Sequence, residues 1–124
     1  MRFEDLKVWK KAARLATDIF AHTKSLKNWG FRDQITRAVL SISSNIAEGS
    51  DRDSPRDLSL FLRYARGSCA ETRSQLYIGI KAGYIEKDFG FRCVGITKEI
   101  SAMLFSLRRT IRKKAKQNKE RDEK

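Results

Sequence analysis

The chain has 124 residues, and its 27 lysines and arginines against 15 aspartates and glutamates give it a formal charge of +12. This length suits one domain that buries its core without metals or disulfides, and no apolar run approaches the roughly 20 residues that span a bilayer. No signal peptide is recognisable, so we expect a cytoplasmic protein without a membrane partner. Two cysteines and one histidine are too few for a disulfide scaffold or a His/Cys metal site, and we predict neither a metal nor another cofactor.

A first helix is predicted over residues 4–25, because apolar residues recur there at alternating steps of three and four, the spacing of one helix face. These residues are Leu6, Trp9, Ala13, Ala16 and Phe20, with Ala12, Leu15 and Ile19 widening the stripe. Residues 27–30 (Lys-Asn-Trp-Gly) form the first predicted break. A second helix follows and ends near Gly49. Its seam consists of Ile35, Val39, Ile42 and Ile46.

A third helix is predicted to begin after Ser54, because serine caps helices and Pro55 fits the first helical position. Its seam is Leu58, Leu62, Ala65, Cys69, Thr72 and Leu76, and Gly83 is a natural stop. We expect Asp88 to cap the fourth helix. The fourth seam is Ile96, Ile100, Met103, Leu107 and Ile111.

Short connections between such helices predict an all-α fold, an antiparallel up-down-up-down four-helix bundle. We assign residues 1–112 to this bundle. Residues 113–124 are predicted to be a basic C-terminal tail that is frayed or disordered. One domain and one tail are therefore expected.

Two polar stripes run beside the apolar seams of the second and third helices. They consist of Gln34, Arg37, Ser41, Asn45 and Glu48, and of Ser68, Glu71 and Gln75. We interpret them as a structural hydrogen-bonded network, within the bundle or between subunits, in which Arg37 pairs with Glu71 or Glu48. A ligand-binding cleft is the alternative. Catalysis by the two carboxylates is disfavoured because no nucleophile, metal ligand or phosphate-binding glycine loop accompanies them, and we predict no enzyme and no catalytic residue.

Two groups of cations are candidates for binding an anionic partner. Four arginines spaced by seven, three and seven residues share one face of the third helix: Arg56, Arg63, Arg66 and Arg73. A second group crowds the end of the fourth helix: Arg108, Arg109, Arg112, Lys113, Lys114 and Lys116. We favour a non-enzymatic oligomer that binds RNA or DNA through phosphate contacts with little sequence preference. The alternatives are a scaffold that docks to an acidic protein, and a solvated helix end whose cations complement the helix dipole.

The segment 41–49 (SISSNIAEG), followed by Arg52 and Ser54, resembles the SIxSNIAEGxxRxS signature of the 23S rRNA intervening-sequence proteins. Further matches extend the resemblance from residue 3 to about residue 111. They include Phe3, Leu6, Trp9, Gln34, Arg37, Phe61, Ala65, Gly67, Ser68, Glu71 and the turn 83–85. The sequence departs from the pattern at Ser43, where a proline is usual, and over residues 27–31.

This resemblance implies a four-helix bundle that assembles into a ring-like homopentamer. Some members of the family are encoded within insertions in ribosomal RNA genes. Related accessory proteins of diversity-generating retroelements bind a reverse transcriptase and nucleic acid. The resemblance therefore implies a fold and a set of partners, but no single biochemical role.

Overall fold

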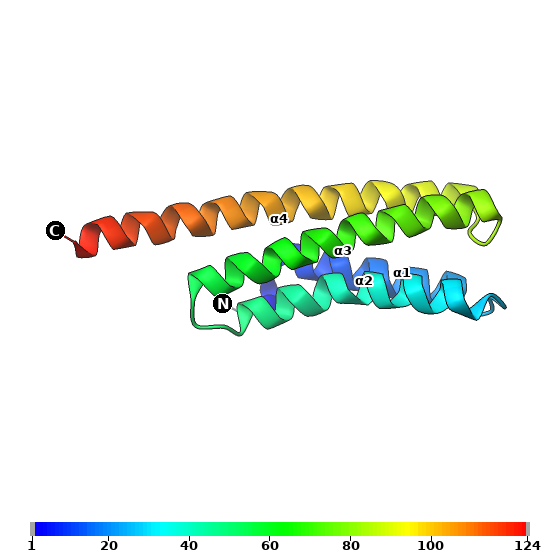
Figure 1. Ribbon diagram of the computed structural model, residues 1–124, viewed down its shortest axis with the longest axis horizontal. Helices are drawn as coiled ribbons and strands as arrows, with labels where there is room; N and C mark the ends of the chain where they lie inside the picture. Colours follow the sequence, from blue (N-terminus) through cyan, green and yellow to red (C-terminus); the bar gives the residue numbers. More distant parts are fainter. Residues whose placement is uncertain (1, 124) are drawn as a thin grey trace.

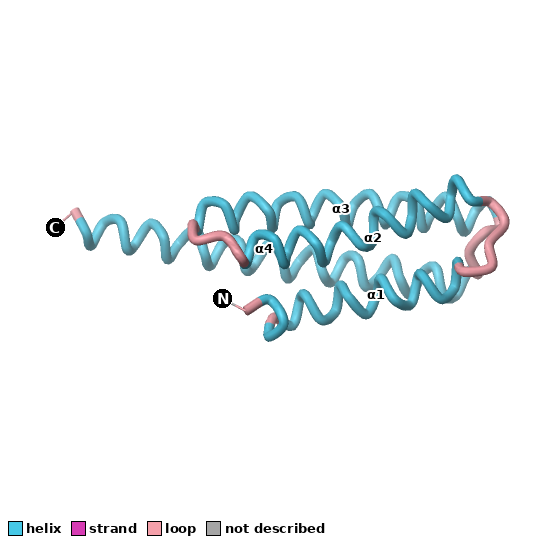
Figure 2. The backbone as a smooth tube through the Cα atoms, turned by 90° about the horizontal axis from the view of Figure 1, so that it is seen from below, coloured by secondary structure: helices cyan, strands magenta, loops and turns pink. Residues whose placement is uncertain are grey.

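The computed structural model describes residues 2–123 (Figure 1). A short 3-10 helix, η1, spans Phe3–Asp5, and the four α-helices are α1 Lys7–Thr23, α2 Trp29–Ser50, α3 Pro55–Ala82 and α4 Lys87–Asp122. Successive helices run in opposite directions, and their three connections are short (Figures 1 and 2). The described residues form no strand. The prediction of an all-α four-helix bundle is confirmed.

One apolar cluster fills the space between the four helices. The predicted seams of α2 and α3 lie at its centre, and Ile42, Leu62 and Leu76 are completely buried. On α1 the centre of the buried face falls on Ala12, Leu15 and Ile19, whereas the predicted residues Leu6, Trp9 and Phe20 are only partly buried at its margin. The broad stripe of α1 and the burial of its residue Ala16 agree with the prediction, but the centre of the buried face lies on the residues that were expected to widen the stripe. The reason is that α1 contacts both α2 and α4, which selects the middle of the stripe.

Both cysteines belong to this core and carry free thiols. Burial raises the pKa of Cys69 to about 12 and that of Cys93 to about 11. Both thiols therefore stay protonated at neutral pH and are poor nucleophiles, because the thiolate is the reactive form.

The ends of α3 follow the sequence signals. Ser54 caps the helix by accepting a hydrogen bond from the Asp57 backbone N–H at 3.3 Å, and Pro55 opens its first turn. Gly83 ends it with a φ of +80°, a left-handed conformation in which glycine has no Cβ penalty. Both predictions for α3 are confirmed.

Two other helix starts differ from expectation. Asn28 accepts a hydrogen bond from the Phe31 backbone N–H at 3.0 Å, so α2 begins at Trp29 inside the predicted break. Glu86, not Asp88, caps α4, because its carboxylate accepts hydrogen bonds from the backbone N–H groups of Phe89 (2.8 Å) and Asp88 (3.1 Å). These two hydrogen bonds stabilise the charged carboxylate and so lower the pKa of Glu86 below its usual value. The bond from Phe89 has the larger effect.

The structure also differs from the expected tail. Helix α4 does not fray at residue 113 but continues to Asp122, past the end of the bundle (Figures 1 and 2). The physical reason is composition: residues 113–122 contain no glycine or proline, and their four lysines, with one alanine, one glutamine, one glutamate and one arginine, favour helix. The cations of this segment are therefore displayed along a helix.

Gly49, the glycine of the SNIAEG block, lies where α2 approaches α3 closely. A Cβ added there would stand 2.7 Å from the Cβ of Phe61 and 3.4 Å from the carbonyl oxygen of Leu58. Neither atom is the flexible end of a side chain, so the helices would have to move apart. Gly95 in α4, in contrast, has open space around its position.

We expect Gly49→Ala to lower the free energy of unfolding by about 1–3 kcal/mol, the cost of overpacking a close contact. The matched control, Gly95→Ala, should raise it by about 0.5–1 kcal/mol, because alanine is the better helix former and meets no neighbour. Denaturant titrations followed by circular dichroism measure both changes. Equal effects of the two substitutions would contradict the close approach at Gly49.

Candidate nucleic-acid interface

Part of the predicted polar network joins α2 to α3. The Ser68 hydroxyl donates a hydrogen bond to the Ser41 Oγ at 3.0 Å. Asn45 Nδ2 donates to the same Oγ at 3.1 Å and to the Ser41 carbonyl at 2.8 Å. Ser68 is buried, and Ser41 and Asn45 are half-buried. These three residues form a small hydrogen-bonded bridge between the two helices.

The charged members of the stripe do not join this bridge. Glu48 forms an ion pair with Arg52 at 3.0 Å, one turn further along the chain, which is a local contact that needs no second helix. Glu71 is exposed and accepts only a long hydrogen bond, 3.5 Å, from Gln75. Gln34 and Arg37 are also exposed. Within residues 2–123 no ion pair links Arg37 to either glutamate, so the predicted pairing is not found in this chain.

The two predicted groups of cations meet along one face of the bundle, between α3 and α4. Three arginines cross this face by donating their Nε–H to a hydroxyl group on the opposite helix. The bonds join Arg73 to Thr97 (3.0 Å), Arg66 to Ser101 (3.5 Å) and Arg108 to Ser59 (3.0 Å). Because each bond uses the inner Nε, it fixes the guanidinium while leaving its two outer amino groups for another acceptor. We call Arg56, Arg63, Arg66, Arg73, Arg108 and Arg112 the arginine row.

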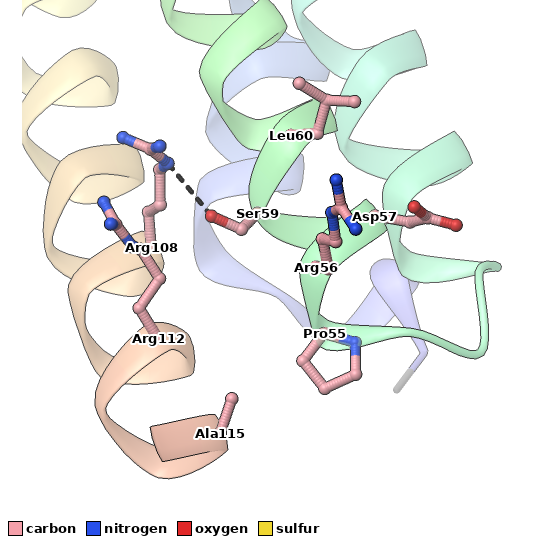
Figure 3. Close-up of a pocket in the computed structure, with 8 residues that line it drawn as sticks. All are labelled: Pro55, Arg56, Asp57, Ser59, Leu60, Arg108, Arg112 and Ala115. Carbon is pink, nitrogen blue, oxygen red and sulfur yellow. Dashed lines mark hydrogen bonds between the residues drawn. The ribbon is translucent and has the colours of Figure 1, made fainter. Parts of the chain in front are cut away.

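The row ends in an open pocket of about 450 Å³ at the start of α3. Figure 3 shows Arg56 extending from α3, and Arg108 and Arg112 extending from α4, with the Arg108–Ser59 hydrogen bond between the helices. Asp57 is the one carboxylate among the lining residues. The pocket is therefore a basic recess built from two helices.

Like charges crowd around Arg108. Partial burial lowers the pKa of its guanidinium, and the neighbouring charges of Arg112, Arg63 and Arg66 lower it further. No ion pair within residues 2–123 involves any member of the arginine row. The guanidiniums of this face are thus not held in ion pairs by the described carboxylates.

The remaining predicted cations extend the same region along α4. Arg109 and Lys113 border a second shallow recess next to the row, together with Arg112. Lys116 is exposed further along the helix. Sequence reasoning missed Ser59, Thr97 and Ser101, because only the α3–α4 register shows that they face arginines. It also missed Phe105. This aromatic residue does not belong to the apolar seam of α4 and is followed by Arg108 and Arg109, and that pattern could have indicated an exposed ring among cations.

Residues 2–123 hold no group of three histidine, cysteine, aspartate or glutamate side chains placed to bind a metal ion. None of the described helices is long and apolar enough to cross a membrane.

The fold and this face define a class of protein: a small four-helix bundle whose α3–α4 side carries uncompensated arginines. The chain belongs to the 23S rRNA-intervening sequence protein family, which its residues 4–106 match. The resemblance seen in the sequence is confirmed. A protein with unknown function of the S23 ribosomal protein family from Bacteroides thetaiotaomicron, known from a crystal structure, has a similar fold. The two structures superpose with a TM-score of 0.76, and the two sequences are 27% identical. The match covers 81% of this chain and 96% of the Bacteroides protein. No curated protein matches this sequence.

We expect inorganic phosphate to raise the melting temperature more than chloride at the same ionic strength, because a bound anion relieves repulsion among the crowded guanidiniums. Changing Arg63 and Arg112 to Gln should remove most of the extra increase. Changing Lys24 and Lys27, at the opposite end of the bundle, should not. Phosphate also stabilises proteins generally, so an identical increase in parent and both variants would show that no specific anion site exists.

Proposed function

We propose that this protein is a non-enzymatic nucleic-acid-binding protein whose α3–α4 face contacts phosphates with little sequence preference. The observation that carries the proposal is the arginine row, in which guanidiniums from two helices are fixed by Nε–hydroxyl bonds and lack acidic partners. From Arg56 to Arg73 the row covers about 25 Å of α3, at 1.5 Å per residue. That length corresponds to about seven steps of one nucleic-acid strand at 3.4 Å per step.

The chemistry of the row favours phosphates over protein carboxylates as its natural partner. Arginine presents paired donors in a plane that matches phosphate oxygens, and a regular series of phosphates lets several such groups bind at once. Residues 2–123 form no helix-turn-helix or zinc finger that would read base edges. We therefore expect affinity to depend on salt more than on sequence. Docking to an acidic protein, such as a reverse transcriptase, is the rival function.

We also propose that the protein self-associates, with five subunits as the number that the family resemblance implies. Support comes from the outer side of α3, where a stripe at steps of four and three residues is exposed. It consists of Leu60, Tyr64, Gly67, Glu71, Ser74 and Ile78. Tyr64 is 49% exposed and Ile78 58%, and a stripe that displays large apolar side chains is a candidate contact between proteins. A ring would repeat the arginine row in every subunit and strengthen binding through avidity.

The binding proposal is tested by changing Arg109, Arg112, Lys113 and Lys116 to Gln, which spares the core. We expect weaker binding to DNA and RNA alike and a smaller salt dependence. Each lost phosphate contact should remove about 0.7–0.9 from the slope of log affinity against log salt concentration. Fluorescence anisotropy titrations over a range of salt concentrations measure both quantities.

The matched control removes the same charge from the opposite end of the bundle, by changing Lys24, Lys27, Lys81 and Lys87 to Gln. All four side chains are exposed. This variant should keep most of the parent's affinity and salt slope. Equal losses in the two variants would mean that net charge alone drives binding, and no binding by the parent would favour the protein-docking alternative.

Self-association is tested by the double change Tyr64→Glu and Ile78→Glu, which should yield monomers because carboxylates would be buried in the subunit contact. Trp29→Gln is the control, since Trp29 is exposed at the end of the bundle and not on the α3 stripe. Size exclusion with light scattering gives the mass of each species. A monomeric parent at micromolar concentration would refute self-association.

A further inference from the structure

One aromatic ring lies among the cations of the α3–α4 face. Phe105 is on α4, and its side chain is 44% exposed. The guanidinium of Arg66 lies 5.0 Å from the centre of its ring, and that of Arg109 lies 5.9 Å away. Phe105 borders the same shallow recess as Arg66, Arg73 and Lys98. It is the only aromatic ring of the described chain over which two arginines lie.

The two arginines are held differently. Arg66 is half-buried, and its Nε–H donates a long hydrogen bond, 3.5 Å, to Ser101 on the opposite helix. Arg109 is exposed and makes no side-chain hydrogen bond or ion pair within residues 2–123, and its distance to the ring is near the outer limit of about 6 Å for a cation–π interaction. Arg109 is thus free to leave the ring at small cost. The ring would then be open on the side that Arg109 covers.

We propose that Phe105 is a base-stacking platform and that the ligand of this face is single-stranded nucleic acid. An unpaired base takes the place of Arg109 on the ring, and the released guanidinium binds a neighbouring phosphate. Arg66, which is half-buried, stays beside the ring and binds the backbone. This inference rests on the proposed function and narrows it from nucleic acid in general to strands with exposed base faces.

The restriction to single strands follows from the chemistry of stacking. An aromatic side chain can stack only on a base whose face is free, and in a duplex both faces of each base are covered by neighbours. Every base has such a face, so stacking adds affinity without adding sequence preference. Arginines along a groove with an aromatic ring among them are the arrangement that non-specific single-strand binders use.

The test compares the parent with Phe105→Leu, which keeps apolar bulk but removes the flat ring. The probes are a fluorescent single-stranded DNA of mixed sequence, the RNA of the same sequence, and the corresponding DNA duplex. The matched control is Phe91→Leu, because Phe91 is a comparably exposed ring (48%) on the same helix, and no guanidinium of residues 2–123 lies over it. Circular dichroism melts verify that each variant is folded.

We expect Phe105→Leu to weaken binding of both single strands by at least about fivefold, within the range for loss of one stacked base, and to leave duplex binding unchanged. Phe91→Leu should change neither. As a second measurement, Phe105→Trp should retain single-strand affinity, and its indole fluorescence should be quenched by single strands but not by the duplex.

Two outcomes would overturn the inference while leaving the proposed function intact. One is an equal loss for single strands and duplex in Phe105→Leu, and the other is no loss for any probe while the arginine variants still lose affinity. If the parent binds none of the three probes, the proposed function itself fails. If Phe105→Leu weakens binding of only the RNA strand or only the DNA strand, the stacking proposal is supported and the ligand is narrowed to that kind of strand.

Discussion

The antiparallel register of α3 and α4 is the constraint on which the basic face depends. It places Ser59 opposite Arg108 and Arg66 opposite Ser101, so that each arginine reaches a hydroxyl on the other helix. A slip of one helical turn, about 5.4 Å, would separate these partners and leave the guanidiniums loose. The register is set by apolar packing, because buried side chains of both helices belong to one core. Core packing thus determines where the charges are held.

Much of this fold could be predicted from the sequence, because its local signals agree with its tertiary packing. Ser54 and Gly83 mark the ends of α3, and the seams of α2 and α3 are the buried residues. Prediction failed at the start of α4, where two nearby residues could each act as the N-cap. Glu86 and Asp88 are both able to cap α4, and only the geometry of the turn shows that the longer side chain reaches two backbone N–H groups. The spacing of apolar residues likewise did not predict how far α4 extends beyond the bundle, because the apolar seam ends at Ile111 and the helix continues to Asp122.

The candidate site was predictable in composition but not in arrangement. The sequence indicates two groups of cations, and the fold joins them into one row that neither group reveals alone. The polar stripes show the opposite outcome: Ser41, Asn45 and Ser68 connect α2 to α3, whereas Arg37 and Glu71 remain exposed. The family match ends at residue 106, so the α4 half of the row that begins at Arg108 lies beyond it. The pocket at the start of α3 thus combines family-matched and additional sequence.

The central claim, that the α3–α4 arginines bind phosphates, is tested most directly by following the Nε–H signals of the arginines by NMR during titration with a short oligonucleotide. The account predicts that the signals of Arg66, Arg73 and Arg108 shift together and saturate. The signal of Arg14 should not move, because Arg14 already pairs with Asp18 on α1. A shift confined to Arg14, or shifts spread evenly over all arginines, would contradict it.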